Sequence, residues 1–235
     1  MAEVVFADDF ESGNLDRWDD DSVMDGPQRL RLSEEAAYRG RYGVEITALP
    51  GSGAGAKLNK WFYPGYDQVH VRWYCRFAED FDQGNHMHFS HLLANRADNR
   101  YSAFGQAGKK PAGDDFFTTG LEPWRDWGQH SAPGEMMRSE TSFVPERGRR
   151  YCMEMMLKAN TPGEADGGQA FWVEGVLLGR FEGIHRGDTL ALKINDFWLM
   201  LFVHESERVN RVYFDEVVIT REYIGQLAAD TTVDD

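Results

Sequence analysis

Apolar and polar residues alternate along several segments of the chain, and this period of two predicts β-strands rather than helices. In Val69–Phe77, the residues Val69, Val71, Trp73, Cys75 and Phe77 share one face. His70, Arg72, Tyr74 and Arg76 share the other face. Turn residues such as Gly, Asn, Asp and Pro bound each such segment. The further strands predicted in this way are Gly43–Ala48, Tyr151–Lys158, Ala170–Leu177, Phe197–His204 and Val212–Thr220.

Helical patterns are scarce, which argues against an α/β architecture. Ser33–Tyr38 predicts about one helical turn with Ser33 as its cap. Residues 95–143 lack a strong period and are predicted as a long loop insertion, whose many aromatic residues favour order. The last ten residues, 226–235, are predicted to form a disordered acidic tail. We therefore expect one all-β domain over residues 1–225.

The net charge of the chain limits which classes of binding partner we expect. The chain has 235 residues, with 25 Lys and Arg against 39 Asp and Glu, for a formal net charge of −14. This balance argues against nucleic acid as a partner and against docking to an anionic membrane, although a local basic cleft can still bind an acidic polysaccharide. No stretch is long and apolar enough to span a membrane, and the first residues do not resemble a signal peptide. The protein is then either cytoplasmic or exported with its signal already removed.

The two cysteines, Cys75 and Cys152, both lie in apolar strand-like segments. Two buried thiols that pack as small apolar side chains are the favoured interpretation. A disulfide between neighbouring strands is the alternative, and two cysteines decide neither the pairing nor the compartment.

Motifs at both ends and in the second half resemble a known fold family. Phe6–Trp18 (FADDFESGNLDRW) is similar to the opening strand of secreted concanavalin A-like domains, and Val212–Ile219 with Glu222–Gly225 is similar to their closing strand. Tyr151–Gly163 and Gly168–Gly175 resemble the paired strands of polysaccharide lyase-like jelly rolls, of the alginate, glucuronan and heparin lyase type. The resemblance implies a two-sheet antiparallel β-sandwich, or jelly roll, and a secreted or periplasmic protein.

The same scaffold carries lyases, hydrolases, lectins and non-catalytic modules, so the resemblance indicates a fold more strongly than an activity. Glycosidase relatives carry acidic residues at alternate positions of one strand, and Glu135–Glu140 has the wrong spacing for this pattern. Retaining hydrolysis needs two carboxyl groups about 5 Å apart. We therefore favour a lyase over a hydrolase.

The outward row of the strand Val69–Phe77 is the main catalytic prediction. Arg72, Tyr74 and Arg76 follow one another about 7 Å apart, and arginine binds a uronate carboxylate through a two-pronged contact. Tyrosine can transfer a proton. β-Elimination needs such a carboxylate neutraliser, a base for the C5 proton and an acid for the leaving oxygen. The alternative is an ordinary solvated sheet face.

Histidines supply the remaining chemistry. In Asn85–His91, His88 is predicted as the base, because histidine exchanges protons near neutral pH. The spacing of His86 and His88, with His91 as a third ligand, also suits zinc. Predicted substrate-binding residues are His70, His86, His204, Trp124 and Trp127, the two indoles as stacking surfaces for sugar rings. The alternative is that these side chains pack within the protein.

A structural calcium ion is expected where the first and last strands meet. Calcium prefers oxygen ligands, and related jelly rolls hold an ion at this place. The residues predicted to surround it are Asp9, Glu11, Gly13, Asn14 and Asp215. A polar turn beside a strand acid is the alternative.

Three functions are compatible with these patterns. The first is a lyase that cleaves an acidic, uronic-acid polysaccharide by β-elimination. The second is a non-catalytic carbohydrate-binding module, which would bind oligosaccharides without product. The third is a structural or assembly protein on the same fold.

Overall fold

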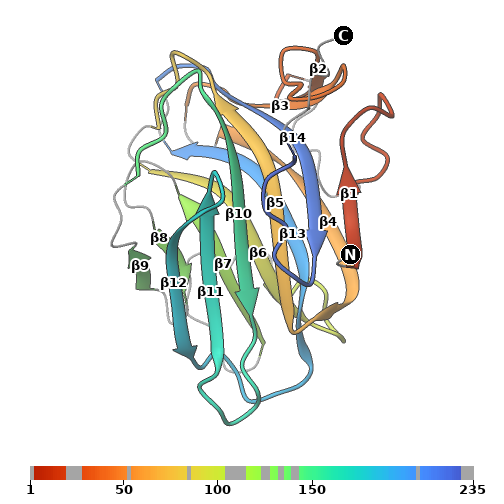
Figure 1. Cartoon of the computed structure of the whole chain (residues 1–235), viewed down its shortest axis with the longest axis vertical. Coiled ribbons are helices and arrows are strands. Elements are labelled where there is room, and N and C mark those ends of the chain that lie inside the picture. Colours follow the sequence, from red (N-terminus) through yellow and green to blue (C-terminus); the bar gives the residue numbers. More distant parts are fainter. Residues whose placement is uncertain are drawn as a thin grey trace.

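The computed structural model describes residues 3–19, 28–51, 54–83, 86–103, 115–122, 128–131, 135–138, 143–204 and 207–228. These residues form two antiparallel β-sheets packed face to face (Figure 1). Within them there is no helix that is long and apolar enough to cross a bilayer. The predicted all-β sandwich is confirmed.

The eight-stranded sheet has a central path of seven strands, and β1 (Val4–Asp8) pairs with its fifth strand. In spatial order the path is β12 (Val176–Ile184), β11 (Gly167–Val173), β10 (Arg150–Lys158), β5 (Gln68–Phe77), β14 (Asn210–Thr220), β3 (Gly43–Ala48) and β2 (Leu30–Ser33). The first and last long strands of the chain therefore lie together, as the resemblance implied.

The six-stranded sheet lies behind it in Figure 1. In spatial order its strands are β4 (Ala54–Tyr66), β13 (Leu192–His204), β6 (His86–Arg96), β7 (Phe116–Glu122), β8 (Gly128–Ser131) and β9 (Glu135–Arg138). The last three strands come from the segment 95–143. The prediction of one long loop there is wrong, because its described part extends the sheet by antiparallel pairing.

Two further predictions need correction. Ala170–Leu177 is not one strand but the hairpin of β11 and β12, in which Glu174 (φ 51°) and Gly175 (φ 72°) form the two-residue turn. The tail prediction is wrong for residues 226–228, since the Leu227 amide donates a hydrogen bond to the Tyr74 hydroxyl. Ser33–Ala36 does form a turn, with the Ser33 hydroxyl accepting the Glu35 amide hydrogen at 3.2 Å.

The core fills the space between the two sheets. The apolar face of β5 points into it as predicted, and Trp73 is fully buried at its centre. The Trp73 ring lies 6.2 Å from the ring of Phe89 on β6 and 5.9 Å from that of Phe197 on β13. Trp73 thus joins one sheet to two strands of the other.

Cys75 and Cys152 are buried free thiols, so the disulfide alternative is wrong. Cys75 belongs to the core between the sheets, whereas Cys152 is opposite Tyr74 in the strand ladder and lies outside that core. Burial raises the pKa of Cys152 to about 11, which keeps this thiol protonated at neutral pH.

We predict that Trp73→Ala lowers the free energy of unfolding by about 3–5 kcal/mol, because a large buried aromatic leaves a cavity between the sheets. Chemical denaturation measures the change. Val176→Ala, at a side chain that is 59% exposed, is the control and should change stability by less than about 0.5 kcal/mol. A Trp73→Ala cost below about 1 kcal/mol would contradict this assignment of the core.

Candidate functional site

The predicted catalytic row on β5 is covered by other parts of the chain. His70, Arg72 and Tyr74 lie on the outer face of the eight-stranded sheet, and only 5%, 2% and 4% of their surfaces are exposed. Alternation therefore predicted the correct face of the strand. It did not predict that this face is buried.

Residues 221–228, which we call the C-terminal segment, cover much of this row. Glu154 on β10 accepts hydrogen bonds from the backbone amides of Ile224 (3.0 Å) and Gly225 (2.8 Å). The Tyr74 hydroxyl accepts one from the Leu227 amide at 2.9 Å, and burial raises the pKa of Tyr74. A buried phenol that already accepts a backbone hydrogen bond is poorly placed to exchange protons with a polymer.

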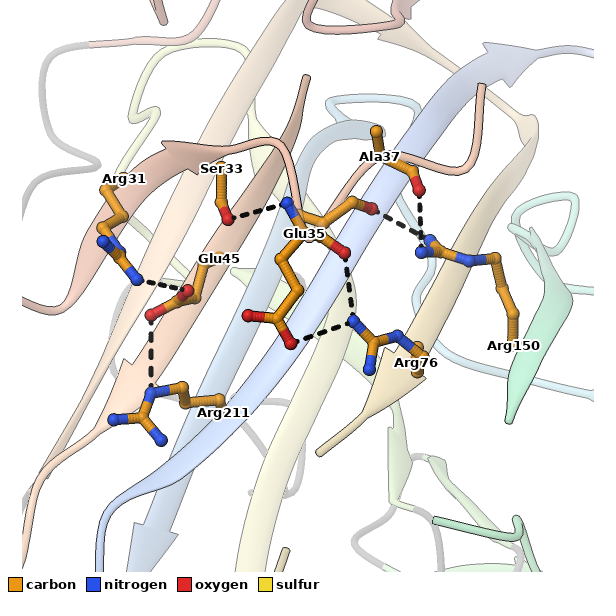
Figure 2. A network of polar contacts seen from close by, with 9 residues as sticks. Arg31, Ser33, Glu35, Ala37, Glu45, Arg76, Arg150 and Arg211 are labelled. Carbon is orange, nitrogen blue, oxygen red and sulfur yellow. Dashed lines mark hydrogen bonds and ion pairs between the residues drawn. The ribbon is translucent and has the colours of Figure 1, made fainter. Parts of the chain in front are cut away.

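Arg76 holds the turn between β2 and β3 against the same face (Figure 2). Its guanidinium donates to the Glu35 carbonyl oxygen at 3.0 Å and lies 3.3 Å from the Glu35 carboxylate. Arg150 donates to the carbonyl oxygens of Ala36 and Ala37. The turn is thereby fixed by two arginines of the sheet beneath it.

A buried carboxylate next to this turn forms ion pairs with two further arginines (Figure 2). Glu45 on β3 is 3% exposed and lies 2.8 Å from Arg31 and 3.5 Å from Arg211. On the same face, Arg72 donates to the Glu216 carbonyl oxygen at 3.2 Å. Arginines of the central and β2-side strands are thus engaged by the protein itself.

The prediction that His88 joins Arg72, Tyr74 and Arg76 in one groove is wrong. His88 belongs to β6 in the six-stranded sheet, whereas the other three lie on β5 in the eight-stranded sheet. Since both rows point away from the shared core, the whole sandwich separates them.

Functional chemistry instead gathers on the outer face of the six-stranded sheet. Along β13, Phe197, Leu199, Leu201 and Val203 point into the core, and the alternate residues Asp196, Trp198, Met200, Phe202 and His204 point outward. Lys57 and Asn59 on β4 face outward beside them, opposite Met200 and Trp198. This face combines a cation, carboxyl and amide groups, and imidazoles.

Asp196 organises the polar residues of this face. Its carboxylate accepts hydrogen bonds from the Asn59 amide at 2.6 Å and from the Trp198 indole at 2.9 Å. Lys57 donates to Asn59 Oδ1 at 3.3 Å and places its ammonium 3.6 Å from the Trp198 ring centroid. Burial raises the pKa of Asp196 to about 8, despite the lowering effect of nearby Lys57.

His88, His91 and His204, which we call the histidine cluster, adjoin this network. The His88 ring lies 5.6 Å from that of His91 and 5.3 Å from that of His204. His91 is fully buried, with its ring 6.2 Å from Trp198, whereas His88 and His204 are half-buried. Ring contacts therefore connect the cluster to Lys57 through Trp198.

A change of register explains why His88 and His91, three residues apart, share one face. His88 pairs with Phe202 but Ser90 pairs with Leu199, so β13 carries one extra residue at this point. Such a bulge shifts the alternation and re-aims side chains. His86 is paired with His204 in the backbone ladder, and its side chain lies outside the described residues, as do Trp124 and Trp127.

Aromatic side chains continue the face beyond Asp196. Trp61 on β4 lies 5.9 Å from the ring of Tyr63 and 5.8 Å from that of Tyr101. The Arg100 guanidinium lies 5.7 Å from Trp61 and 4.7 Å from Tyr101. Tyr63 and Tyr101 are 40% and 44% exposed. We call Trp61, Tyr63, Arg100 and Tyr101 the aromatic patch.

The residues predicted to hold calcium make other contacts. Asp215 accepts the amide hydrogens of Tyr38 (2.6 Å), Arg39 (3.1 Å) and Glu216 (2.7 Å). Glu11 accepts those of Arg41 and Tyr42, both at 2.7 Å. These two carboxylates therefore face amide hydrogens, which occupy oxygens that a cation would need.

Three other members of the predicted calcium site lie in the turn after β1. Asp9 accepts the amide hydrogen of Glu11, Asn14 accepts that of Asp16, and Gly13 has a positive φ of 73°. Among the residues described, no group of three or more His, Cys, Asp or Glu side chains is placed to hold a metal ion, and this includes the histidine cluster. Calcium binding stays a prediction without support from these contacts.

Lys57, Asn59, Asp196 and the aromatic patch were not predicted from the sequence. Residues 54–62 do alternate, with Ala56, Leu58 and Phe62 inward. The alternation of these residues is hard to recognise in the sequence, because some of the apolar residues are small alanines and the polar residues Lys57, Asn59 and Lys60 lie among them. Asp196 was missed because it lies just outside the apolar run Phe197–His204.

Comparison with known proteins supports the fold. No protein-family profile and no curated protein matches the chain by sequence. Solved structures do match: a marine PL-14 alginate lyase from Aplysia kurodai has a TM-score of 0.72 at 14% identity, over 94% of this chain and 100% of that one. An endo-β-1,4-glucuronan lyase from the fungus Trichoderma reesei has a TM-score of 0.65 at 15% identity, over 94% and 96% of the two chains.

A hydrolase shares the architecture as well. The catalytic domain of a glycoside hydrolase family 131 protein from Coprinopsis cinerea has a TM-score of 0.53 at 12% identity, over 97% of this chain and 98% of that one. At such identities the similarity concerns the fold alone. The chain is thus a jelly roll with the fold of polysaccharide lyases.

Proposed function

We propose that the protein binds an acidic polysaccharide across the outer face of the six-stranded sheet and cleaves it by β-elimination. The observation that carries the proposal is a series that begins at the aromatic patch, whose Trp61 pairs with Asp196 in the strand ladder. Side-chain contacts then lead from Asp196 through Asn59, Lys57 and Trp198 to the histidine cluster. Structural neighbours that are alginate and glucuronan lyases support uronic-acid polymers as the substrate class.

β-Elimination assigns a task to each group. Lys57 would act on the uronate carboxylate through its charge rather than by direct contact, because only 4% of its surface is exposed, and this positive charge makes the C5 proton more acidic. A neutral imidazole of His88 or His204 would accept that proton, and a second, protonated group would donate one to the O4 leaving group. The C4–O4 bond breaks while C4 and C5 form a double bond, so protons and electrons balance without a co-reactant.

The aromatic patch would hold neighbouring sugar units. Sugar rings stack on indole and phenol faces, and Arg100 between them offers a cation for a second carboxylate. Two cations, Lys57 on β4 and Arg100 in the turn after β6, suit a polymer that carries a charge on each unit. This supports an acidic substrate despite the net charge of −14.

The protonation of Asp196 would control how strongly Lys57 attracts substrate. Below about pH 8 burial keeps Asp196 largely neutral, which leaves less negative charge beside Lys57. At higher pH, Asp196 ionises and competes with the uronate for Lys57. Asp196 is a positioning residue in this scheme, because its own surface is only 1% exposed.

A purely binding function is the second candidate. It is favoured by the burial of Lys57, which is 4% exposed and so offers a polymer little direct contact. Binding that persists in His88→Ala, together with the absence of any product from wild type, would favour this candidate over the lyase.

We predict that the wild-type protein releases unsaturated products from alginate or glucuronan, measured as ultraviolet absorbance of the new double bond conjugated to the carboxylate. His88→Ala should lower the rate by about 10²-fold or more, as expected for loss of a proton-transfer group. Tyr74→Phe is the matched control on the opposite face and should retain the wild-type rate.

Two results would contradict the lyase proposal. One is a panel of uronic-acid polymers with no gain in absorbance. The other is a rate lost in Tyr74→Phe but kept in His88→Ala, which would return catalysis to the eight-stranded sheet.

We predict a pH dependence of stability caused by Asp196. Its pKa is raised in the folded protein, so the folded state binds more protons than the unfolded state between about pH 4 and pH 8. Stability should therefore fall as pH rises through this window, relative to Asp196→Asn, which cannot ionise. Lys57 opposes the effect and Asp19 reinforces it. Denaturation of both proteins at several pH values tests this, and parallel pH curves would contradict it.

A further inference from the structure

A hollow of about 440 Å³ opens on the outer face of the eight-stranded sheet, on the side of the sandwich away from the histidine cluster. Its floor consists of His70 on β5, Met156 on β10 and Trp172 on β11, all at most 7% exposed. Its volume falls within the range typical of small-ligand sites. We call it the Tyr223 hollow, after the exposed ring in its wall.

Three aromatic rings from separate parts of the chain meet in this hollow. The Tyr223 ring lies 5.1 Å from Trp172 and 6.3 Å from His70, and the His70 and Trp172 rings are 5.7 Å apart. Tyr223 belongs to the C-terminal segment and is 47% exposed. An exposed phenol face above a buried indole suits a flat ring with one apolar side, such as the C–H face of a pyranose.

The polar side chains that line the hollow can form hydrogen bonds with the hydroxyl groups of a sugar. Gln68, Arg180 and Glu222 also line it and together supply donors and acceptors. His70 Nδ1 lies 2.9 Å from the Glu154 carboxylate, which can only accept, so the proton of a neutral His70 is on Nδ1. The lone pair of Nε2 is then left for a ligand hydroxyl.

A second hollow adjoins the first. It shares Gln68 and Glu222 with it, is lined in addition by Glu3 and Arg221, and also measures about 440 Å³. Two connected hollows provide room for consecutive units of a chain rather than for a single small molecule. The positive groups Arg180 and Arg221 stand beside Glu3 and Glu222, so the rim carries both signs.

We propose that the Tyr223 hollow is a second saccharide-binding site, which holds a pyranose unit of a polysaccharide by stacking on Tyr223, by hydrogen bonds donated by Arg180 and Gln68, and by a ligand hydroxyl that donates to His70 Nε2. It lies on the opposite face from the proposed catalytic groups, so it binds polymer without cleaving it. The site stands on its own residues and does not require lyase activity.

Affinity gel electrophoresis of the full chain tests the proposal, with alginate and glucuronan as uronic-acid polymers and laminarin and hydroxyethylcellulose as neutral ones. His88→Ala is the background, so that cleavage does not interfere. We expect retardation by at least one polymer and an affinity at least tenfold lower after Tyr223→Ala. Tyr223→Phe should restore binding, because the stacking face remains. A loss in Arg180→Ala confined to uronic-acid polymers would identify the carboxylate as part of the ligand.

Leu177→Ala, at a 43% exposed side chain on neighbouring β12, is the control and should bind like the background. Thermal denaturation of each variant verifies folding. Equal retardation of Tyr223→Ala and its background, or no retardation by any of the four polymers, would overturn the proposal. Retardation that depends on Tyr223 in a protein without lyase activity would uphold this site while contradicting the proposed catalysis.

Discussion

The contact between Glu154 and the C-terminal segment closes over part of the outer face of the eight-stranded sheet. Glu154 is 2% exposed, and its carboxylate accepts hydrogen bonds from His70 and from two backbone amides of that segment. A buried carboxylate is costly unless such donors satisfy it. With the segment in place, the Tyr74 hydroxyl is bonded to the Leu227 amide, and Arg72 is held separately by Glu216 on β14, so the chemistry expected from β5 is used in contacts within the protein.

The outer face of the six-stranded sheet is built differently, because its polar side chains belong mainly to neighbouring strands. Its polar groups lie along β4, β6 and β13, three neighbouring strands of one sheet, and their positions follow from strand pairing rather than from loops. Strands hold side chains more precisely than loops do, which suits proton transfer. Two kinds of surface thus arise on one sandwich: a face that, apart from the Tyr223 hollow, is largely engaged by the chain's own segments, and a face whose cation, imidazoles and aromatic rings lie along the strands.

The sequence predicted the fold well, because alternation in β3, β5, β10 and β14 depends on local residues alone. The face of each side chain on β5 was also predictable. The partners of Arg72 and Tyr74 were not, since Glu216 and Leu227 are far apart in sequence from β5. The joint position of His88 and His91 depends on a bulge in β13, which no pattern in Asn85–His91 reveals. The prediction named both His88 and His204 but placed His88 with the wrong strand, β5.

The most direct test of the proposed substrate face is a crystal structure of the His88→Ala variant with a uronic-acid tetrasaccharide. We expect sugar units across the six-stranded sheet, with one unit beside the histidine cluster and a ring on the aromatic patch. Sugar bound to Arg72 and Tyr74 with residues 221–228 displaced would contradict this assignment.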